Sequence, residues 1–310
     1  MHAPRVLRTA AAAVLVAALA ALAGCAEGTA TPLPEPSAQT PSADGGSTVP
    51  GEDVARALGE VEAAHDVTVG VAVVDADGEI LSYRGDERFG YASTLKAFAA
   101  AALLAVKTPA ERAETVTWTQ AEVDAAGYSP VTSMHVGDGL TRDELAEAAV
   151  RDSDNTAMNL VMSSVGGPAG VEDFLRGIGD ETTRVTAFEP QLNDVRPGSE
   201  ENTTTPDAAA SALREILAGE ALAAEEAATW LEWMSGNATG DTLIRSAAPS
   251  GWTVADKSGG AGGIRNDVAV VTSPDGRRVF LAVLTRTNDP DASYDDAAVA
   301  DAARVVFDAL

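Results

Sequence analysis

The stretch STLKAFAAAALL, residues 93–104, is the most informative part of the chain. A serine and a lysine stand three residues apart where an apolar helix begins, so the Ser93 hydroxyl and the Lys96 amine share one face of it. Unpaired backbone N–H groups at a helix start favour a developing oxyanion. A partly buried lysine has a lowered pKa and can accept the hydroxyl proton. The pattern predicts a serine nucleophile, although alone it also fits a capping serine beside a solvated lysine.

Strand patterns lie well before and well after this helix. Two early apolar runs and three late ones, joined in part by Asp-Gly turns, occupy residues 67–74, 79–83, 253–257, 267–272 and 278–285. The region between them, 93–235, is mostly helical, and an amphipathic helix over 293–310 closes the chain. We therefore expect an antiparallel five-stranded sheet flanked by helices, plus a helical lobe, with the site in the cleft between lobes. The expected catalytic domain is 51–310, with an α/β lobe at 51–87 and 236–310 and a helical lobe at 88–235.

Three further motifs follow in order along the chain. They are Ser153-Asp154-Asn155 between two helical segments, Phe188-Glu189-Pro190-Gln191-Leu192-Asn193 in an irregular stretch, and Lys257-Ser258-Gly259-Gly260 at the end of a strand. Each alone has a structural explanation as a helix cap, a surface turn or a strand terminus. Only three of the 21 basic residues are lysines, however, and Lys96 and Lys257 both lie in these motifs. A cation that must lose a proton cannot be arginine, so the lysine usage favours chemistry.

The four motifs and their spacing resemble those of class A β-lactamases, for which S-x-x-K, S-D-N and K-T-G are signatures. The resemblance extends over residues 52–310 and includes the segments 128–131, 237–245 and 251–259. It implies the two-lobed fold shared by serine β-lactamases and penicillin-binding proteins. It also implies hydrolysis of β-lactam antibiotics through an acyl-enzyme on Ser93. Lys-Ser-Gly replaces the commoner Lys-Thr-Gly here, and a serine hydroxyl can serve the same role.

The resemblance also implies the catalytic residues and their roles. Ser93 attacks the lactam carbonyl, and Lys96, Glu189 through a water, or both accept its proton. Ser153 passes a proton to the departing lactam nitrogen. Glu189 and Asn193 direct the water that hydrolyses the acyl-enzyme, which separates a hydrolase from a target protein that stays acylated.

The substrate-binding positions implied in the same way are Tyr128, Asn155, Lys257, Ser258, Gly260 and Arg265. Lys257, Ser258 and Arg265 bind the substrate carboxylate as a local positive patch. The backbone N–H of Gly260 joins that of the nucleophile in holding the oxyanion, and the other two residues contact the acyl side chain and the rim of the cleft. No metal or cofactor is implied.

The segment around Glu189 departs from the family pattern. Class A enzymes usually pair an Arg two residues before the Glu with an Asp 13 residues after it, but those positions are Ala187 and Asn202 here. Nothing nearby in the sequence obviously replaces that brace. We therefore expect a more mobile loop, with slower deacylation or greater tolerance of bulky acyl groups. A cis peptide at Glu189–Pro190 is also implied by the resemblance.

The N-terminus indicates export. Arginines precede an apolar run that ends Leu22-Ala23-Gly24-Cys25 and is too short to span a bilayer comfortably. The ending resembles the lipobox of bacterial lipoproteins, which predicts a signal peptide over 1–24, a lipid on Cys25 and anchoring outside the cytoplasm. The alternative is ordinary cleavage after Ala23, which leaves Cys25 as a free thiol. Residues 25–50 are rich in Pro, Ser, Thr and Ala and predict a disordered linker.

Charge and composition narrow the possible functions. A net charge of −26 disfavours nucleic acid or an anionic membrane surface as a partner and favours a solvated acidic surface. We expect a monomer. Three histidines, one of them in the signal, do not support a zinc lactamase or a Ser-His-Asp triad. Two alternatives remain: a penicillin-binding or D-Ala-D-Ala peptidase-like protein, against which Glu189 and Asn193 argue, and a non-catalytic cell-wall-binding lipoprotein of the same fold.

Overall fold

The computed structural model describes residues 51–289 and 291–310, so the predicted signal peptide, Cys25 and the linker lie outside the described residues. No helix in this described part is both long enough and apolar enough to cross a bilayer. The elements in chain order are α1 Glu52–His65, β1 Val67–Val74, β2 Glu79–Tyr83, β3 Phe89–Gly90, η1 Ala92–Thr94, α2 Leu95–Val106, α3 Pro109–Arg112, β4 Thr115–Val116, α4 Gln120–Ala126, η2 Thr132–Met134, β5 Leu140–Thr141, α5 Arg142–Arg151, α6 Asn155–Ser164, α7 Gly167–Gly177, η3 Gln191–Asn193, β6 Thr203–Thr204, α8 Pro206–Ala218, α9 Ala224–Ser235, α10 Ile244–Ala247, β7 Thr253–Ala261, β8 Ile264–Thr272, β9 Arg278–Thr287 and α11 Asp296–Ala309.

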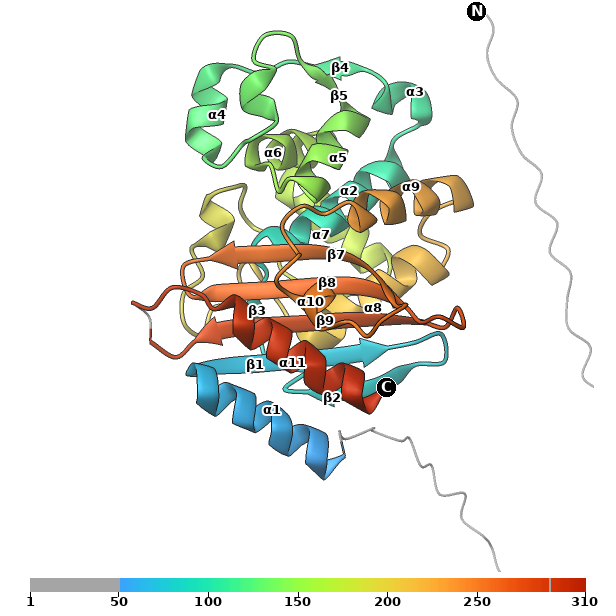
Figure 1. The fold of residues 1–310 in the computed structure, drawn as a ribbon. Coiled ribbons are helices and arrows are strands. Elements are labelled where there is room, and N and C mark those ends of the chain that lie inside the picture. The colour runs from blue at the N-terminus through green and yellow to red at the C-terminus, as the bar shows by residue number, and fades with distance from the viewer. Residues whose placement is uncertain (1–50, 290) are drawn as a thin grey trace, which may run out of the picture. The chain divides into compact units, whose positions relative to one another are not determined.

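Five antiparallel strands form the main sheet in the order β2-β1-β9-β8-β7 (Figure 1). The first two come from the start of the domain and the last three from its end, which confirms the predicted sheet. Three strand boundaries were wrong. Lys257 was expected at a strand end, but β7 continues to Ala261, which pairs with Ile264 at the start of β8, and β9 continues to Thr287. The hairpin closes tightly because Gly262 adopts a φ of +53°, a conformation that glycine allows at little cost. Lys257 is therefore held inside a paired strand.

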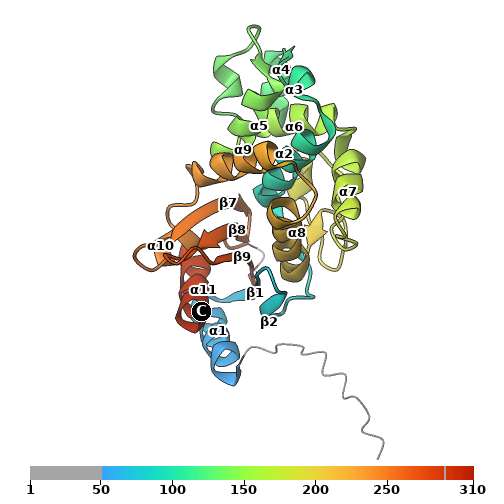
Figure 2. The ribbon, with the colours of Figure 1, turned by 90° about the vertical axis from the view of Figure 1, so that its right-hand side faces the viewer.

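Both faces of the sheet are buried, which explains the continuous apolar runs of its inner strands. Along β9, Val279, Leu281 and Val283 face one hydrophobic core, whereas Phe280 and Leu284 face the other. The helices α1 and α11 cover the first face, and α2, α8 and α9 lie on the second (Figure 2). The motif residues lie where the helical region meets β7.

Sequence signals and packing together determine where the helices near the site begin. The helices α3, α4 and α5 each follow a Thr-x-x-Glu capping box, formed by Thr108 and Glu111, Thr119 and Glu122, and Thr141 and Glu144. The helix α2 lacks a side-chain cap, but its residues from Leu95 to Leu104 are all buried. The Trp230 indole also donates to the Ala97 carbonyl at 2.8 Å. Because tertiary contacts surround α2, it is a rigid support for the nucleophile at its start.

His65, the last residue of α1, gives the fold a pH-dependent contact with α11. Its Nδ1 lies 2.6 Å from Asp295 Oδ2 and its Nε2 lies 3.0 Å from Asp301 Oδ2. Burial lowers the pKa of His65, but hydrogen bonds to the two carboxylates outweigh burial and leave the pKa raised. The stabilisation is therefore complete below the unfolded pKa of about 6.5 and is lost as the pH rises through the folded pKa.

We expect His65→Gln to lower the unfolding midpoint by about 2–4 °C near pH 6, which corresponds to roughly 1 kcal/mol in a domain of this size. At about pH 9 the wild-type imidazole is neutral, so the difference between the two proteins should shrink. Thermal unfolding followed by circular dichroism at both pH values measures this. A difference that does not depend on pH would contradict the assignment.

Candidate active site

The predicted nucleophile and its neighbouring amine are in contact. Ser93 is half-buried in the 3-10 turn Ala92–Thr94, which runs directly into α2. The Lys96 side chain is fully buried, and its Nζ lies 2.8 Å from Ser93 Oγ. The sheet holds this segment in place, because Asn266 of β8 donates from Nδ2 to the Gly90 carbonyl at 2.7 Å. Ser93 is therefore both reachable and rigidly supported.

Lys96 is surrounded by oxygen atoms. In addition to Ser93 Oγ, its Nζ lies 2.7 Å from the Ser153 carbonyl, 2.6 Å from Asn155 Oδ1 and 3.2 Å from Glu189 Oε1. Burial lowers the pKa of Lys96, and the nearby Glu189 carboxylate opposes this shift. The amine releases its proton more readily than an exposed lysine, so it can exchange one with the serine hydroxyl.

The Ser153-Asp154-Asn155 motif forms the turn between α5 and α6. Asp154 caps α6 by accepting from Ala157 N at 2.8 Å, and it also accepts from Thr132 N at 2.8 Å. The backbone N–H of Asn155 donates to the Tyr128 carbonyl at 2.8 Å. The segment that begins at Tyr128 is therefore fixed beside this turn.

Ser153 stands between the two motif lysines. Its Oγ lies 3.3 Å from Lys96 Nζ and 3.2 Å from Lys257 Nζ. The residue has a φ of +57°, a left-handed conformation in which a non-glycine residue is uncommon and which here directs its hydroxyl between the two amines. This hydroxyl can accept a proton from one amine as it gives up its own.

Glu189 approaches the same amine from the loop after α7. The Glu189–Pro190 peptide is cis, as the resemblance implied. The side chain of Asn159 binds both backbone groups of Glu189, with Oδ1 accepting from its N–H at 2.8 Å and Nδ2 donating to its carbonyl at 2.9 Å. Asn193 Nδ2 donates to Glu189 Oε2 at 2.7 Å, and Ser93 Oγ donates to Glu189 Oε1 at 3.4 Å. The carboxylate is therefore fixed against the nucleophile.

The strand β7 passes directly against the nucleophile's turn. A Cβ atom on Gly259 would lie 2.9 Å from the Tyr91 carbonyl oxygen and 3.0 Å from Thr94 N, so only glycine fits this close approach. The neighbouring Gly260 is exposed. This packing places the backbone of β7 against the turn that carries Ser93.

Charged and hydroxyl groups line the β7 side of the site. Gly260 pairs with Arg265 of β8, and the Ser258 hydroxyl lies 2.6 Å from the Thr239 hydroxyl. Lys257 is buried, and burial followed by repulsion from Lys96 lowers its pKa to about 7. An anionic group bound here would meet a serine hydroxyl and a lysine that holds its proton only below neutral pH.

Arg265 is oriented by two neighbours near the end of the chain. Its Nε donates to Asp296 Oδ1 at 2.6 Å, and its guanidinium lies 4.8 Å from the centre of the Tyr294 ring. Tyr128, the predicted rim residue, is 61% exposed and lies beside the Ser153 turn. The predicted residues of the described part therefore gather around one site.

Comparisons with known proteins identify the family of the chain. A family model described as "Beta-lactamase enzyme family" matches residues 53–310. The chain is 40% identical to a β-lactamase of Bacillus licheniformis over 97% of this chain and 94% of that protein, and 44% identical to β-lactamase FAR-1 of Nocardia farcinica over 78% of each. The chain belongs to the class A β-lactamase family. Among solved structures, a class A β-lactamase from Clostridium kluyveri superposes with a TM-score of 0.79 at 37% identity, covering 83% of this chain and 98% of that one.

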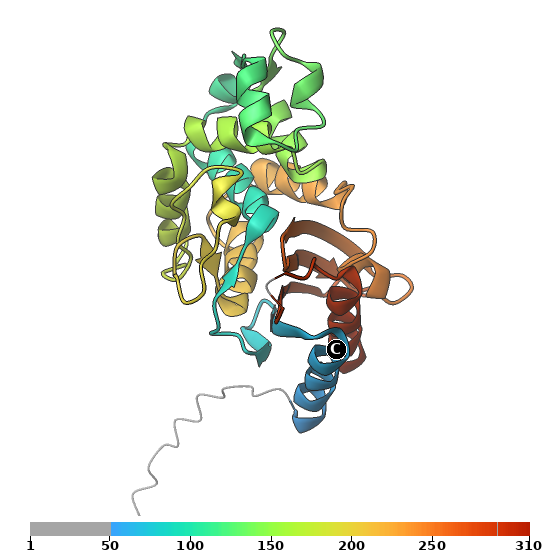
Figure 3. The ribbon, with the colours of Figure 1, turned by 90° about the vertical axis from the view of Figure 1, so that its left-hand side faces the viewer.

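The expectation that nothing replaces the family's loop brace is wrong. Asn202 lies at the end of the loop, and its Oδ1 accepts from Thr186 N at 3.0 Å and from the Tyr91 hydroxyl at 3.0 Å. A neutral amide thus links the two ends of the loop where other class A enzymes use an ion pair. Figure 3 shows this loop, in yellow, beside the segment that leads into α2. Ala187 takes no part in these hydrogen bonds.

Sequence reasoning missed Asn159, which holds the backbone of Glu189. A signal was available, because Asn155 and Asn159 are four residues apart and share one face of α6. Thr239 beside Ser258 was also missed as an individual residue, although its segment was included in the resemblance. The contacts themselves were not predictable, since each joins residues from distant parts of the chain.

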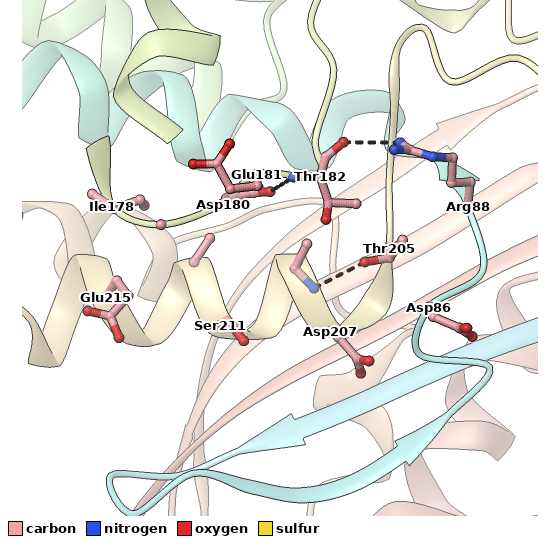
Figure 4. A pocket seen from close by; sticks show the side chains of 13 residues that line it. Asp86, Arg88, Ile178, Asp180, Glu181, Thr182, Thr205, Asp207, Ser211 and Glu215 are labelled. Atoms are coloured by element: carbon pink, nitrogen blue, oxygen red, sulfur yellow. Dashed lines mark hydrogen bonds between the residues drawn. The ribbon is translucent and has the colours of Figure 1, made fainter. Parts of the chain in front are cut away.

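A cavity of about 590 Å³ lies away from these residues, between α8, the loop after α7 and the segment before β3 (Figure 4). Its charged lining is mostly acidic and comprises Asp86, Arg88, Asp180, Glu181, Asp207 and Glu215. It contains none of the motif residues. A smaller cavity, of about 300 Å³, has Glu189 and Asn159 in its lining. Lys96 and Glu189 are packed against each other with almost no exposed surface.

Proposed function

We propose that this class A β-lactamase hydrolyses β-lactam antibiotics through an acyl-enzyme on Ser93, with water activated by Glu189. The observation that supports this most directly is the meeting of three groups: Ser93 Oγ lies 2.8 Å from Lys96 Nζ and 3.4 Å from Glu189 Oε1. In an acyl-transfer reaction, the amine can accept the hydroxyl proton during acylation and the carboxylate can activate water during deacylation.

In the acylation half, Ser93 Oγ forms a bond to the lactam carbonyl carbon. Its proton passes to the neutral amine of Lys96, or through a water to Glu189, and backbone N–H groups of Ser93 and Gly260 stabilise the oxyanion. The C–N bond then breaks, and the Ser153 hydroxyl supplies the proton that the leaving nitrogen takes. The lysines on either side of Ser153 can restore that proton.

In the deacylation half, Glu189 removes a proton from a water that attacks the ester carbonyl. The bond from that carbon to Ser93 Oγ then breaks, and the serine oxygen takes back the proton held by Glu189. Asn193 supports this step through both ends of its side-chain amide. Its Nδ2 donates a hydrogen bond to Glu189, and its buried Oδ1 accepts none from any described residue and is therefore free to bind a water. Such an acceptor can orient the attacking water. A placed general base contributes about 10²–10⁴-fold, which makes the difference between turnover and a trapped ester.

In this proposal the substrate carboxylate is bound by Lys257, Ser258 and Arg265. Binding depends on pH because it depends on the protonation state of Lys257. Because its pKa is lowered to about 7, Lys257 is protonated below that pH and neutral above it. We expect KM to rise as the pH increases beyond neutrality. Lys257→Arg keeps a cation that does not titrate, so its KM should stay nearly level over the same range. Parallel KM profiles for the two proteins would refute this assignment.

The central test is incubation with a chromogenic cephalosporin while colour and protein mass are followed together. Steady turnover supports the proposal. A single stable adduct without turnover would instead indicate a penicillin-binding protein. No reaction would indicate a protein that has the fold without the activity.

We further propose export, anchoring through a lipid on Cys25, and action as a monomer. The support is the sequence of residues 1–25, with its basic start, apolar run and Leu-Ala-Gly-Cys ending. Metabolic labelling with palmitate should mark the wild type but not Cys25→Ser. Unlabelled wild-type protein would refute the anchor, and sedimentation of the domain tests the monomer.

A further inference from the structure

We propose that His65 is a positioning residue that holds the start of α11 in place, so that Arg265 is presented correctly to the substrate carboxylate. This inference rests on the proposed function, in which Arg265 binds that carboxylate. It goes beyond that function because it gives a part in substrate binding to a residue of α1, which lies outside every catalytic motif.

The first support is the segment 294–296, which joins Arg265 to the start of α11. The Arg265 guanidinium lies 4.8 Å from the centre of the Tyr294 ring, and its Nε donates to Asp296 Oδ1 at 2.6 Å. The residue between these two is Asp295, the N-cap of α11, whose Oδ1 accepts from Ala297 N at 2.8 Å. Both neighbours of Arg265 in this segment are therefore bonded directly to Asp295 along the chain.

The second support is that His65 holds the middle of this segment from another helix. The helices α1 and α11 lie side by side over the same hydrophobic core (Figure 1). His65 Nδ1 lies 2.6 Å from Asp295 Oδ2, and its Nε2 lies 3.0 Å from Asp301 Oδ2 further along α11. The imidazole thus contacts α11 at two points, of which only the first adjoins the residues that hold Arg265.

The third support is the confined position of Arg265 in the site. Only 11% of its side chain is exposed, and a Cβ atom on Gly260 would lie 3.0 Å from Arg265 Nη1 and 3.2 Å from Tyr294 Cε1. The guanidinium and the tyrosine ring therefore lie beside the α-carbon of Gly260, in the strand that carries the other two carboxylate-binding residues. A shift of the segment 294–296 moves the guanidinium relative to those two groups.

The protonation state of His65 decides how firmly it holds α11. A protonated imidazole donates to both carboxylates, whereas a neutral one has a single N–H and can donate to only one. Burial lowers the pKa of His65, but hydrogen bonds to the two carboxylates outweigh burial and leave the pKa raised. The two-point contact is therefore complete below the unfolded pKa of about 6.5 and is lost as the pH rises through the folded pKa.

The neighbouring groups do not supply a competing titration at this contact. The strand β1, which also packs against α1, carries no titratable side chain. Burial raises the pKa of Asp296, but hydrogen bonds from Thr242 and Arg265 outweigh burial and leave it lowered, so this carboxylate stays ionised. Among the described residues, the other charged groups on the segments around His65 make no hydrogen bond or ion pair with it; they are Glu62, Asp66, Arg286, Asp289, Asp291 and Arg304.

The test compares the KM of the wild type with that of His65→Gln at about pH 6 and about pH 9. Glutamine carries no charge at either pH, so we expect KM to rise about 3–10-fold at the lower pH, with kcat within about twofold. At the higher pH the wild-type imidazole is neutral, and the two KM values should agree within about twofold. Both proteins contain Lys257, so its titration cancels from the ratio of the two KM values.

Two variants of α11 form a matched pair. Asp295→Asn removes the carboxylate next to Asp296 but keeps an oxygen that can cap the helix, and it should raise KM at about pH 6 as His65→Gln does. Combining these two substitutions should add nothing further. Asp301→Asn removes the other carboxylate that the same imidazole binds, and it should leave KM within about twofold because it does not adjoin the segment that holds Arg265.

A chromogenic cephalosporin with a methyl ester in place of its carboxylate separates positioning from a general loosening of the fold. It lacks the anion that Arg265 binds, so its kcat/KM at about pH 6 should agree within about twofold between the wild type and His65→Gln. An equal loss with the acid and with the ester would indicate a structural role alone and would overturn the inference.

Unchanged KM in folded His65→Gln at about pH 6, an equal rise at both pH values, or equal effects of Asp295→Asn and Asp301→Asn would also overturn it. Arg265→Ala in the same assay keeps the two proposals apart. A wild type that does not turn over, or an Arg265→Ala variant with unchanged KM, removes the proposed function or the proposed carboxylate ligand, and this inference with it. If the wild type turns over and Arg265→Ala raises KM while His65→Gln does not, only the positioning role fails.

Discussion

Replacing Glu189 with alanine is expected to convert the hydrolase into a protein that is acylated once and stays acylated. Glu189 is the carboxylate held by Asn159 and Asn193 against Ser93 Oγ, and no other described carboxylate contacts that oxygen. Losing a general base costs about 10²–10⁴-fold in the step that it catalyses. Protein mass should increase by that of one bound β-lactam, while kcat falls by this factor.

Two controls sharpen this experiment. Glu189→Gln keeps the size of the side chain and its contact with Asn193, so a trapped adduct in both variants assigns the effect to the lost base. Ser93→Ala should give neither turnover nor adduct. Continued rapid turnover in Glu189→Ala would rule out Glu189 as the base for deacylation.

Replacing Lys96 with methionine is expected to slow acylation, the first half of the reaction. The amine contacts Ser93 Oγ at 2.8 Å, and burial lowers its pKa so that a neutral form is accessible. We expect kcat/KM to fall by about 10²–10⁴-fold, because the serine loses the group that accepts its proton. Pre-steady-state acylation measured by mass should slow by the same factor.

This variant also removes the partner of a buried carboxylate. Breaking a buried ion pair costs about 3–5 kcal/mol, so the unfolding midpoint of Lys96→Met must be measured beside its kinetics. Lys107→Met is the matched control, since Lys107 is partly exposed and contacts Glu111 on the surface. Normal acylation in a folded Lys96→Met would assign proton removal to Glu189 acting through water.

Much of the fold was predictable because its signals are local. The five strand segments are apolar runs bounded by turns, and the structure contains all five in one antiparallel sheet. The misplaced boundaries are the ends of β7 and β9 and the start of β8, by two to four residues; at β7, residues 258–260 gave no strand pattern. Pairing with β8 extends the strand there, and pairing partners are not visible in a single stretch of sequence.

The candidate site was also predictable only in part. Ser93 and Lys96 are one helical turn apart, and the other motifs are continuous stretches of a few residues, so their chemistry could be recognised before their geometry was known. The distances among the motifs were not predictable, because they depend on how the helical region packs against β7. The lowered pKa of Lys257 is likewise a result of burial beside Lys96.

The sequence by itself determined the order of the chemical groups, the sheet and the absence of the usual ion pair around the Glu189 loop. Only the tertiary structure decided what stands in its place. The hydrogen bond from Tyr91 to Asn202 joins residues 111 positions apart, and the two that bind Asn159 to Glu189 span 30. Such contacts form because folding buries polar groups that must then find partners, and that requirement selects neighbours in space and leaves no periodic pattern along the chain.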